Sequence, residues 1–400
     1  MTILPDQKDY IQKHFEAMQN KIEFLSLLNY AKSILFGEKG EPFVIRQLNY
    51  YINTASKAAS YQAFEIKKKN GGTRNILAPN QGLKAIQSCL SLILQEIYIV
   101  NAAAKGFVKG RSIVDNASIH IQQYYVFNID LKDFFSSIDQ ARVWARLKMA
   151  PINLNSSTNR QELSNIIAKL CCHELEVERL NMEGEWEKQK KNVLPQGAPT
   201  SPVLSNLICE KLDKRLTGVA RRFGLRYSRY ADDITFSSLH HVYNNEGDFV
   251  REITRIINEQ NFHIKETKTR MQGQGYRQEV TGLIVNERVN VPKRYTKELR
   301  KWLYLWENYG HDRAYLFFKQ SYLNDKIRDN RFKPDMIKIL AGKLDFLKMI
   351  RGAEDHMYKK LQQRFLALIP KTSSLSKVLD TWEELGIEKA MEEYYAHRTA

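Results

Sequence analysis

Hydrophobic positions with helical spacing occur in four separate stretches of the chain. Apolar side chains recur at three- and four-residue steps over residues 7–36, which predicts a helix there. Residues 83–100 and 204–216 show the same spacing, and so does the segment around Phe249. A further short helix is expected from Ile113, after a glycine-rich loop. Beyond Pro292 the pattern is mainly helical to the end, without an internal repeat.

Strand-like segments lie between these helices. Residues 61–79 alternate in their first part and contain Asn70-Gly71-Gly72, a sequence typical of a hairpin turn. The β-branched and aromatic run over residues 125–129 predicts a buried strand that leads into Asp130. Residues 225–238 predict two short strands, and residues 278–290 are again strand-like. A mixed middle followed by a helical last third predicts the α+β class, with that third as a separate lobe.

Composition limits the class of protein. The chain has 400 residues, 43% hydrophobic and 26% charged, which is ordinary globular material and excludes disorder, collagen and coiled coil. Its longest apolar stretch, residues 90–100, is broken by Gln95 and Glu96 and is too short to span a bilayer. No signal peptide is apparent, and the four cysteines include no C-x-x-C pair. We therefore expect a cytoplasmic protein with no membrane partner.

Charge is unevenly distributed along the chain. With 61 Lys and Arg against 45 Asp and Glu, the net charge is +16. Residues 288–351 alone carry 16 basic and 7 acidic residues, whereas residues 380–400 carry 2 basic and 6 acidic ones. The basic segment also contains Trp302, Tyr304, Trp306, Tyr309, Phe317 and Phe318. Such a segment suits a nucleic-acid backbone, although a solvated helical face with its own core residues is the alternative.

Three aspartates stand where carboxylates are costly, because each is embedded among apolar neighbours of a predicted strand. Asp130 ends the first strand of the middle region, and Asp232 and Asp233 follow Tyr230-Ala231 at a predicted hairpin tip. A lone aspartate there could be a satisfied turn carboxylate, but the adjacent pair is harder to explain in that way. If the fold brings all three together, their repulsion must be relieved by protonation or by divalent metal, and hard oxygen ligands suit Mg²⁺.

The sequence around these aspartates resembles that of reverse transcriptases. Tyr230-Ala231-Asp232-Asp233 is similar to their Y-x-D-D signature, and other motifs follow in the order of the family. These motifs are FEIKKKNGGTRNILAP (64–79) for the fingers hairpin, NIDLKDFF (128–135) for the first palm strand, LPQGAPTSPVLSN (194–206) for the template-and-nucleotide loop, and KETKTR (265–270) for a late palm motif. The resemblance covers residues 64–300, over half of the chain.

Two further elements resemble those of bacterial retron reverse transcriptases. Asn116-Ala117-Ser118-Ile119-His120 fits their N-A-x-x-H element, and Val280-Thr281-Gly282 fits their V-T-G element. The Gly106–Ser112 loop is also typical of the retron and group II intron branch. The resemblance implies that Asn116, His120, Val280, Thr281 and Gly282 contact RNA. Asn116 and His120 would share one face of a helix, so a core role is the alternative for that pair.

The resemblance also implies a role for individual site residues. Asp130, Asp232 and Asp233 would be the catalytic carboxylates and would hold two Mg²⁺ ions, with the Leu131 carbonyl completing the ligand set. Two such ions would activate an attacking oxygen and stabilise a leaving pyrophosphate. Phe135 would be the aromatic gate that excludes a ribose 2′-hydroxyl, and simple palm packing is the alternative.

Nucleotide contacts are implied on the fingers side of the site. Lys68 and Arg74 would bind the triphosphate of the incoming nucleotide, and the planar fork of Arg74 suits bidentate phosphate binding. Gln196 and Gly197 would lie against nucleotide and template. Lys268 is the candidate for the lysine that protonates the leaving pyrophosphate, with Lys265 as a competitor.

The architecture implied is a right-hand polymerase. We predict an N-terminal helical region over residues 1–60, fingers over 61–125 and a palm with antiparallel sheet and helices over 126–290. A basic helical thumb would cover residues 291–370, and an acidic C-terminal extension would follow over 371–400.

Retron enzymes copy part of a structured noncoding RNA into DNA from a 2′-hydroxyl of that RNA, which leaves a branched RNA–DNA product. The resemblance therefore implies this RNA, its DNA product and dNTPs as partners. It also implies an effector protein, separate or fused, in antiphage defence. The alternatives are another bacterial reverse transcriptase, defence-associated or intron-like, and a catalytically silent RNA-binding scaffold.

Overall fold

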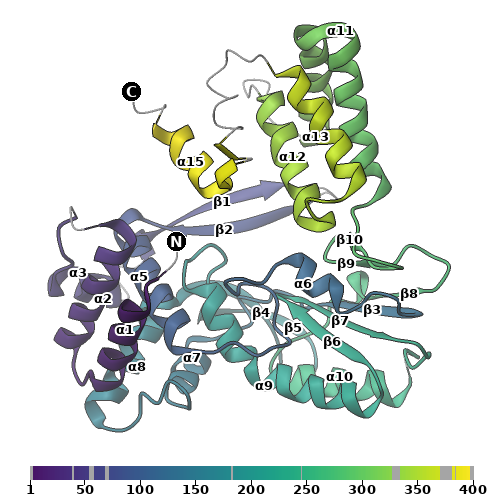
Figure 1. Ribbon diagram of the computed structural model, residues 1–400. Coiled ribbons are helices and arrows are strands. Elements are labelled where there is room, and N and C mark those ends of the chain that lie inside the picture. The colour runs from purple at the N-terminus through teal and green to yellow at the C-terminus, as the bar shows by residue number, and fades with distance from the viewer. Residues whose placement is uncertain are drawn as a thin grey trace. The chain divides into compact units, whose positions relative to one another are not determined.

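The computed structural model describes residues 3–37, 40–53, 58–67, 72–181, 183–244, 246–326, 334–369, 381–382 and 384–396 (Figure 1). The chain forms two compact units, Met1–Arg288 and Val289–Ala400. Helices and antiparallel sheets are mixed in the first unit, which confirms the predicted α+β class. None of the helices in the described ranges combines the length and apolar composition needed to cross a bilayer.

A cluster of helices forms the N-terminal part of the first unit. Its members are α1 (Pro5–Ala17), α2 (Lys21–Phe36), α3 (Ile45–Ile52), α5 (Gln81–Ile97), α7 (Gln140–Leu147) and α8 (Thr158–Cys171). The prediction of one helix over residues 7–36 is wrong, because the chain breaks at Asn20. The side chain of Asn20 accepts hydrogen bonds from the N–H groups of Ile22 and Glu23 and so caps α2. The buried faces of α1 and α2 pack on α5.

A four-stranded antiparallel sheet is the centre of the first unit. Its order is β6 (Arg226–Tyr230), β7 (Asp233–Ser238), β3 (Tyr125–Asp130) and β8 (Arg270–Gly273). The helices α9 (Ser201–Arg222) and α10 (Asp248–Glu259) lie side by side against this sheet (Figure 1). The predicted strands at 125–129 and 225–238 are confirmed, and β3 holds an inner position of the sheet.

Three hairpins and three short helical segments complete the described part of the first unit. The hairpins are β1 (Tyr61–Lys67) with β2 (Thr73–Pro79), β4 (His173–Leu180) with β5 (Trp186–Val193), and β9 (Glu279–Val280) with β10 (Leu283–Ile284). The short helical segments are η1 (Ala58–Ser60), α6 (Ile113–Ser118) and η2 (Glu266–Lys268). The hairpin predicted around Gly71 is confirmed, whereas the strand predicted over 278–290 is only the two-residue pair β9 and β10.

The second unit is helical, as predicted. Its helices are α11 (Lys293–Lys326), α12 (Met336–Arg351), α13 (His356–Leu368) and α15 (Ile387–Ala396). The helix α11 is kinked at Gly310, whose φ is 75°. The aromatic residues of the basic segment divide into two groups: Trp302, Trp306 and Phe318 are buried, and Tyr304, Tyr309 and Phe317 are exposed. The first group is therefore core, and only the second is available for ligand contact.

Candidate active site

The three predicted catalytic carboxylates meet at one end of the sheet. Asp130 is the last residue of β3, and it lies opposite Asp233, the first residue of β7, in the antiparallel register. The N–H of Leu131 donates to the carbonyl oxygen of Asp232 at 3.1 Å. Strand pairing therefore joins Asp130 and Asp233, which are 103 positions apart in the chain, and this is the convergence that the sequence could only suppose.

Electrostatics at this end of the sheet leaves negative charge in excess. Desolvation, followed by repulsion from Asp130, raises the pKa of Asp232. Desolvation and repulsion from the other two carboxylates raise the pKa of Asp233 to about 6. The ammonium of Lys268 lies 2.6 Å from Oδ2 of Asp130 and is the nearest counter-charge. Lys265, its competitor, contributes its backbone N–H to the carbonyl oxygen of Asp130 at 2.8 Å.

Divalent metal fits the chemistry of these donors. Carboxylate oxygens are the hard ligands that Mg²⁺ prefers, and the raised pKa values report a repulsion that a dication would relieve. Within the described ranges, no three Asp, Glu, His or Cys side chains are grouped closely enough to ligate one ion as they stand. The three carboxylates would be the residues to hold such an ion, and the ammonium of Lys268 partly neutralises them.

The turn between β6 and β7 is held in a left-handed conformation. Ala231 has a φ of 58°, which a residue with a β-carbon adopts rarely. Gly106 packs on this turn so closely that a β-carbon there would lie 2.5 Å from the backbone nitrogen of Ala231. Buried Arg229 donates to the Ala231 carbonyl at 3.0 Å. Sequence analysis missed Arg229, although an arginine in an inward-facing strand position is a usable signal.

The fingers hairpin is joined to the loop that precedes α9. The N–H of Leu77 in β2 donates to the carbonyl of Gln196 at 2.8 Å. A β-carbon on Gly197, whose φ is 129°, would lie 2.6 Å from the Leu77 carbonyl oxygen, so glycine permits this approach. Arg74 is exposed on β2, and its charge partly offsets the rise that desolvation causes in the pKa of Asp232. Lys68, the other predicted triphosphate ligand, lies outside the described residues.

The predicted gate residue, Phe135, has a second aromatic neighbour that sequence analysis did not single out. Phe135 is half-buried, and its ring centroid lies 5.3 Å from that of Phe134 and 5.9 Å from that of Phe107. Phe107 is exposed and has a φ of 62°. It follows Gly106, so the loop that packs on the carboxylate turn also brings an aromatic ring close to Phe135.

Asn116 and His120 are fully buried, so the expected RNA contact does not suit them. The two ring nitrogens of His120 lie 2.7 Å from Oγ of Ser237 and 2.8 Å from Oγ of Ser228, and Ser228 donates to Asn116 at 2.7 Å. The helix α6 ends at Ser118, so Asn116 lies on it and His120 follows it, and both side chains contact Ser228. The network ties α6 to β6 and β7, which is the core role that sequence analysis kept as the alternative.

The V-T-G element forms the tight turn of the β9–β10 hairpin. Thr281 and Gly282 have φ values of 47° and 82°. Val280 is buried, while Gly282 is exposed. The exposed turn can therefore contact a ligand at the surface, whereas the buried Val280 side chain cannot.

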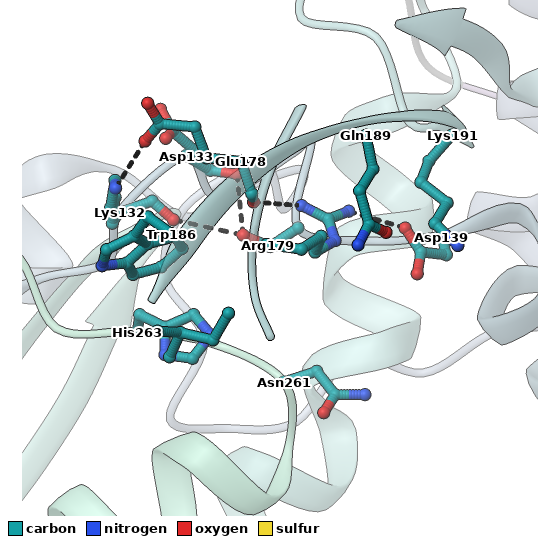
Figure 2. Close-up of a pocket in the computed structure, with 12 residues that line it drawn as sticks. Lys132, Asp133, Asp139, Glu178, Arg179, Trp186, Gln189, Lys191, Asn261 and His263 are labelled. Atoms are coloured by element: carbon teal, nitrogen blue, oxygen red, sulfur yellow. Dashed lines mark hydrogen bonds and ion pairs between the residues drawn. The ribbon is translucent and has the colours of Figure 1, made fainter. Parts of the chain in front are cut away.

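A cavity of about 330 Å³ is lined by the segment after β3, by the β4–β5 hairpin and by Asn261 and His263, and none of the three predicted catalytic aspartates lines it (Figure 2). Its charges are largely paired: Lys132 lies 2.7 Å from Glu178, and Arg179 lies 2.6 Å from Asp139. The Lys132 ammonium also lies 3.6 Å from the ring centroid of Trp186. These contacts fix the β4–β5 hairpin to the segment after β3, and they leave no net charge that would select a ligand.

Comparison with known proteins places the chain in a family. Residues 66–289 match the model of the reverse transcriptase (RNA-dependent DNA polymerase) family. The retron Mx162 reverse transcriptase of Myxococcus xanthus is 35% identical over 259 residues, covering 61% of this chain and 52% of the relative. The retron Ec86 reverse transcriptase of Escherichia coli is 34% identical over 245 residues, covering 60% and 68%.

The similarity to these relatives extends over part of each chain. The chain spans about half the length of the Myxococcus relatives. A solved telomerase from Candida albicans in complex with telomeric RNA aligns with this chain with a TM-score of 0.40 and 11% identity. The alignment covers 83% of this chain and 66% of the telomerase. The family match covers more than half of the chain and includes all three carboxylates. The chain therefore belongs to the reverse transcriptase family of RNA-dependent DNA polymerases, and to its retron branch.

Proposed function

We propose that this protein is an RNA-directed DNA polymerase that copies part of a cognate structured noncoding RNA into DNA. The observation that carries the proposal is the meeting of Asp130, Asp232 and Asp233 at one end of the sheet, beside Lys268. An arrangement that served only the stability of the fold would not bring these carboxylates together, because burial and their mutual repulsion raise the pKa of Asp232 and of Asp233. The arrangement therefore favours a polymerase over a silent RNA-binding scaffold.

Each residue of the site has a specific task in this proposal. Asp130, Asp232 and Asp233 hold two Mg²⁺ ions, with the Leu131 carbonyl as a further ligand. When bound, the ions supply Lewis acidity to the attacking hydroxyl and to the leaving pyrophosphate. Lys268 carries a proton within reach of this site, because its ammonium already contacts Asp130 at 2.6 Å.

The surroundings of the carboxylates bind and select the nucleotide. Arg74 binds the triphosphate of a dNTP with its guanidinium fork, and Lys68 assists it. Gln196 and Gly197 line the template side, where the loop before α9 meets β2. Phe135 blocks a ribose 2′-hydroxyl and so favours deoxynucleotides.

Nucleic acid is bound mainly through its phosphates. The exposed cations of α11 and its exposed Tyr304 and Tyr309 suit a template–primer duplex, with the charge giving affinity and the rings giving packing surface. The β9–β10 turn at Thr281 and Gly282 supplies a further RNA contact.

The retron assignment gives the reaction its substrate and product. The N-A-x-x-H and V-T-G elements and the relatives named as retron reverse transcriptases support it. Priming from a 2′-hydroxyl of the template RNA would leave a branched RNA–DNA molecule. An effector protein and a role in antiphage defence complete the proposal. A cytoplasmic site of action agrees with the four free cysteines.

Primer extension on purified protein tests the polymerase assignment. The wild type should extend a DNA primer on an RNA template with dNTPs and Mg²⁺, and the double substitution Asp232→Ala plus Asp233→Ala should abolish extension. Activity that survives this double substitution would overturn the catalytic assignment.

Sequencing the nucleic acid that co-purifies with the protein tests the retron assignment. A single RNA species joined covalently to DNA through a 2′–5′ branch is expected. Unbranched, heterogeneous cellular RNA would instead favour a bacterial reverse transcriptase of the defence-associated or intron-like kind, primed in another way.

A further inference from the structure

Arg229 is a fully buried cation two positions before the left-handed residue of the carboxylate turn. Its Nε and Nη2 donate to the two carboxylate oxygens of Asp213 in α9, at 2.8 and 2.7 Å. Both side chains of this ion pair have no exposed surface. A buried pair of this kind contributes little net stability, because the desolvation of both charges offsets their attraction. The presence of this ion pair in the core therefore calls for another explanation.

The remaining donors of Arg229 reach beyond Asp213. Nη1 donates to the carbonyl oxygen of Ala231 at 3.0 Å, and Nη2 donates to Oδ1 of Asn206 at 3.1 Å. The Nδ2 of Asn206 in turn donates to the carbonyl of Gly106 at 3.0 Å. Gly106 is the residue that packs against the backbone nitrogen of Ala231. One connected network thus holds the turn by the backbone on both sides of Ala231.

We propose that Arg229 is the positioning residue of the carboxylate turn. By holding the Ala231 carbonyl it maintains the left-handed backbone there, and this backbone sets where Asp232 and Asp233 lie relative to Asp130. Asp213 and Asn206 orient the guanidinium from α9, the helix that directly follows the template-and-nucleotide loop. The proposal rests on the proposed polymerase function and assigns to it a residue that touches neither substrate nor metal.

Arg229→Lys tests this assignment, because a lysine can pair with Asp213 but cannot also reach Ala231 and Asn206. We expect kcat for primer extension to fall by roughly 10- to 100-fold, as a small misplacement of reacting groups does, with KM for template–primer changed less than about threefold. Arg160→Lys is the matched control. Arg160 is also a buried arginine that donates to backbone carbonyls, those of Glu16 and Met18 at 2.6 and 2.8 Å, but it lies in the helical cluster. Its kcat per folded molecule should equal that of the wild type.

A second variant separates positioning from the burial of charge. Arg229→Met with Asp213→Leu removes both charges and replaces them with apolar side chains, a change that buried ion pairs often tolerate. The double variant should fold but should extend primers slowly, because the Ala231 carbonyl has lost the Arg229 side chain that donates to it. Wild-type kcat in the double variant would show that the pair is only a core ion pair and would overturn the proposal.

Hydrogen exchange gives a measurement that does not depend on activity. The amide of Leu131 donates to the carbonyl of Asp232, so its exchange reports the position of the turn. Exchange at Leu131 should quicken in Arg229→Lys and stay unchanged in Arg160→Lys. Unchanged exchange in Arg229→Lys would overturn the positioning. If the wild type extends no primer, the proposed function fails, and the exchange measurement still decides the role of Arg229.

Discussion

Two polar clusters within the same antiparallel sheet are built on opposite principles. The carboxylate cluster of Asp130, Asp232 and Asp233 keeps like charges together at the sheet end, and desolvation with mutual repulsion raises the pKa of Asp233 to about 6. The His120 cluster lies buried against the strands of that sheet, and both ring nitrogens of His120 have a hydroxyl partner. Burial there lowers the pKa of His120 to about 3.

The difference shows how two signature elements of one family can serve different purposes. A cluster that leaves charge unbalanced is a place where a ligand can gain binding energy, because the ligand relieves a cost present in the free protein. The imidazole of His120 has both ring nitrogens hydrogen-bonded inside the protein, so it gains little from a ligand and stabilises the fold instead. The two clusters should therefore respond in opposite ways to substitution.

The largest expected effect is on the carboxylate cluster. Asp233→Asn should lower primer extension by roughly 10³-fold, the scale seen when a group acting on transition-state charge is removed. The same substitution should raise Tm by about 2–4 °C, because it removes a repelled carboxylate whose pKa is raised. Extension assays and thermal unfolding measure the two effects. Asp248→Asn, on an aspartate whose side chain is 86% exposed, is the control and should change neither.

The next effect displaces the carboxylates without removing one. Gly106→Ala would place a β-carbon 2.5 Å from the backbone nitrogen of Ala231, so the turn must move. Extension should fall by roughly 10- to 100-fold because of this displacement. Gly218→Ala, in α9 with nothing within 4 Å of the new β-carbon, is the matched control and should keep full activity. Full activity in Gly106→Ala would mean that the turn tolerates displacement.

The His120 cluster should show the opposite response. His120→Leu should lower the free energy of unfolding by about 2–4 kcal/mol, because the hydroxyls of Ser228 and Ser237 lose their partner inside the core. Extension per folded molecule should stay within about twofold of the wild type, since the buried ring of His120 bonds to strand hydroxyls and contributes to the fold and not to the site. Urea unfolding and extension assays measure both. Weakened RNA binding at unchanged stability would instead restore the RNA-contact interpretation of this element.

The smallest effect is a dependence of stability on pH. His120 has a folded pKa of about 3, below its usual value in an unfolded chain of about 6.5. As pH falls below about 6.5, His120 becomes protonated in the unfolded chain but not in the native protein. The free energy of unfolding of the wild type therefore falls by up to about 1.4 kcal/mol per pH unit. His120→Leu lacks this loss. The stability gap between the two proteins should therefore narrow from pH 7 to pH 5, and a constant gap would contradict the lowered pKa.

Local pattern was enough to predict most elements of the first unit. The β1–β2 hairpin, the strand β3 and the strands around Asp232 follow from alternation and turn residues over short windows. The break between α1 and α2 was missed, although Asn20 is a good N-cap residue, because the apolar spacing continues on both sides of it. The reduction of residues 278–290 to the short pair β9–β10 was not predictable from alternation alone.

The sequence by itself determined the chemistry that the site can perform: three carboxylates, a lysine after them and a family order of motifs. Only the tertiary structure decided which polar residues face a ligand and which are enclosed. It enclosed His120 and Asn116, and it made Arg229 and Gly106 parts of the carboxylate turn through partners in α9 and in the turn itself. The physical reason is that burial and hydrogen-bond pairing depend on contacts between segments about a hundred residues apart, which no local spacing records.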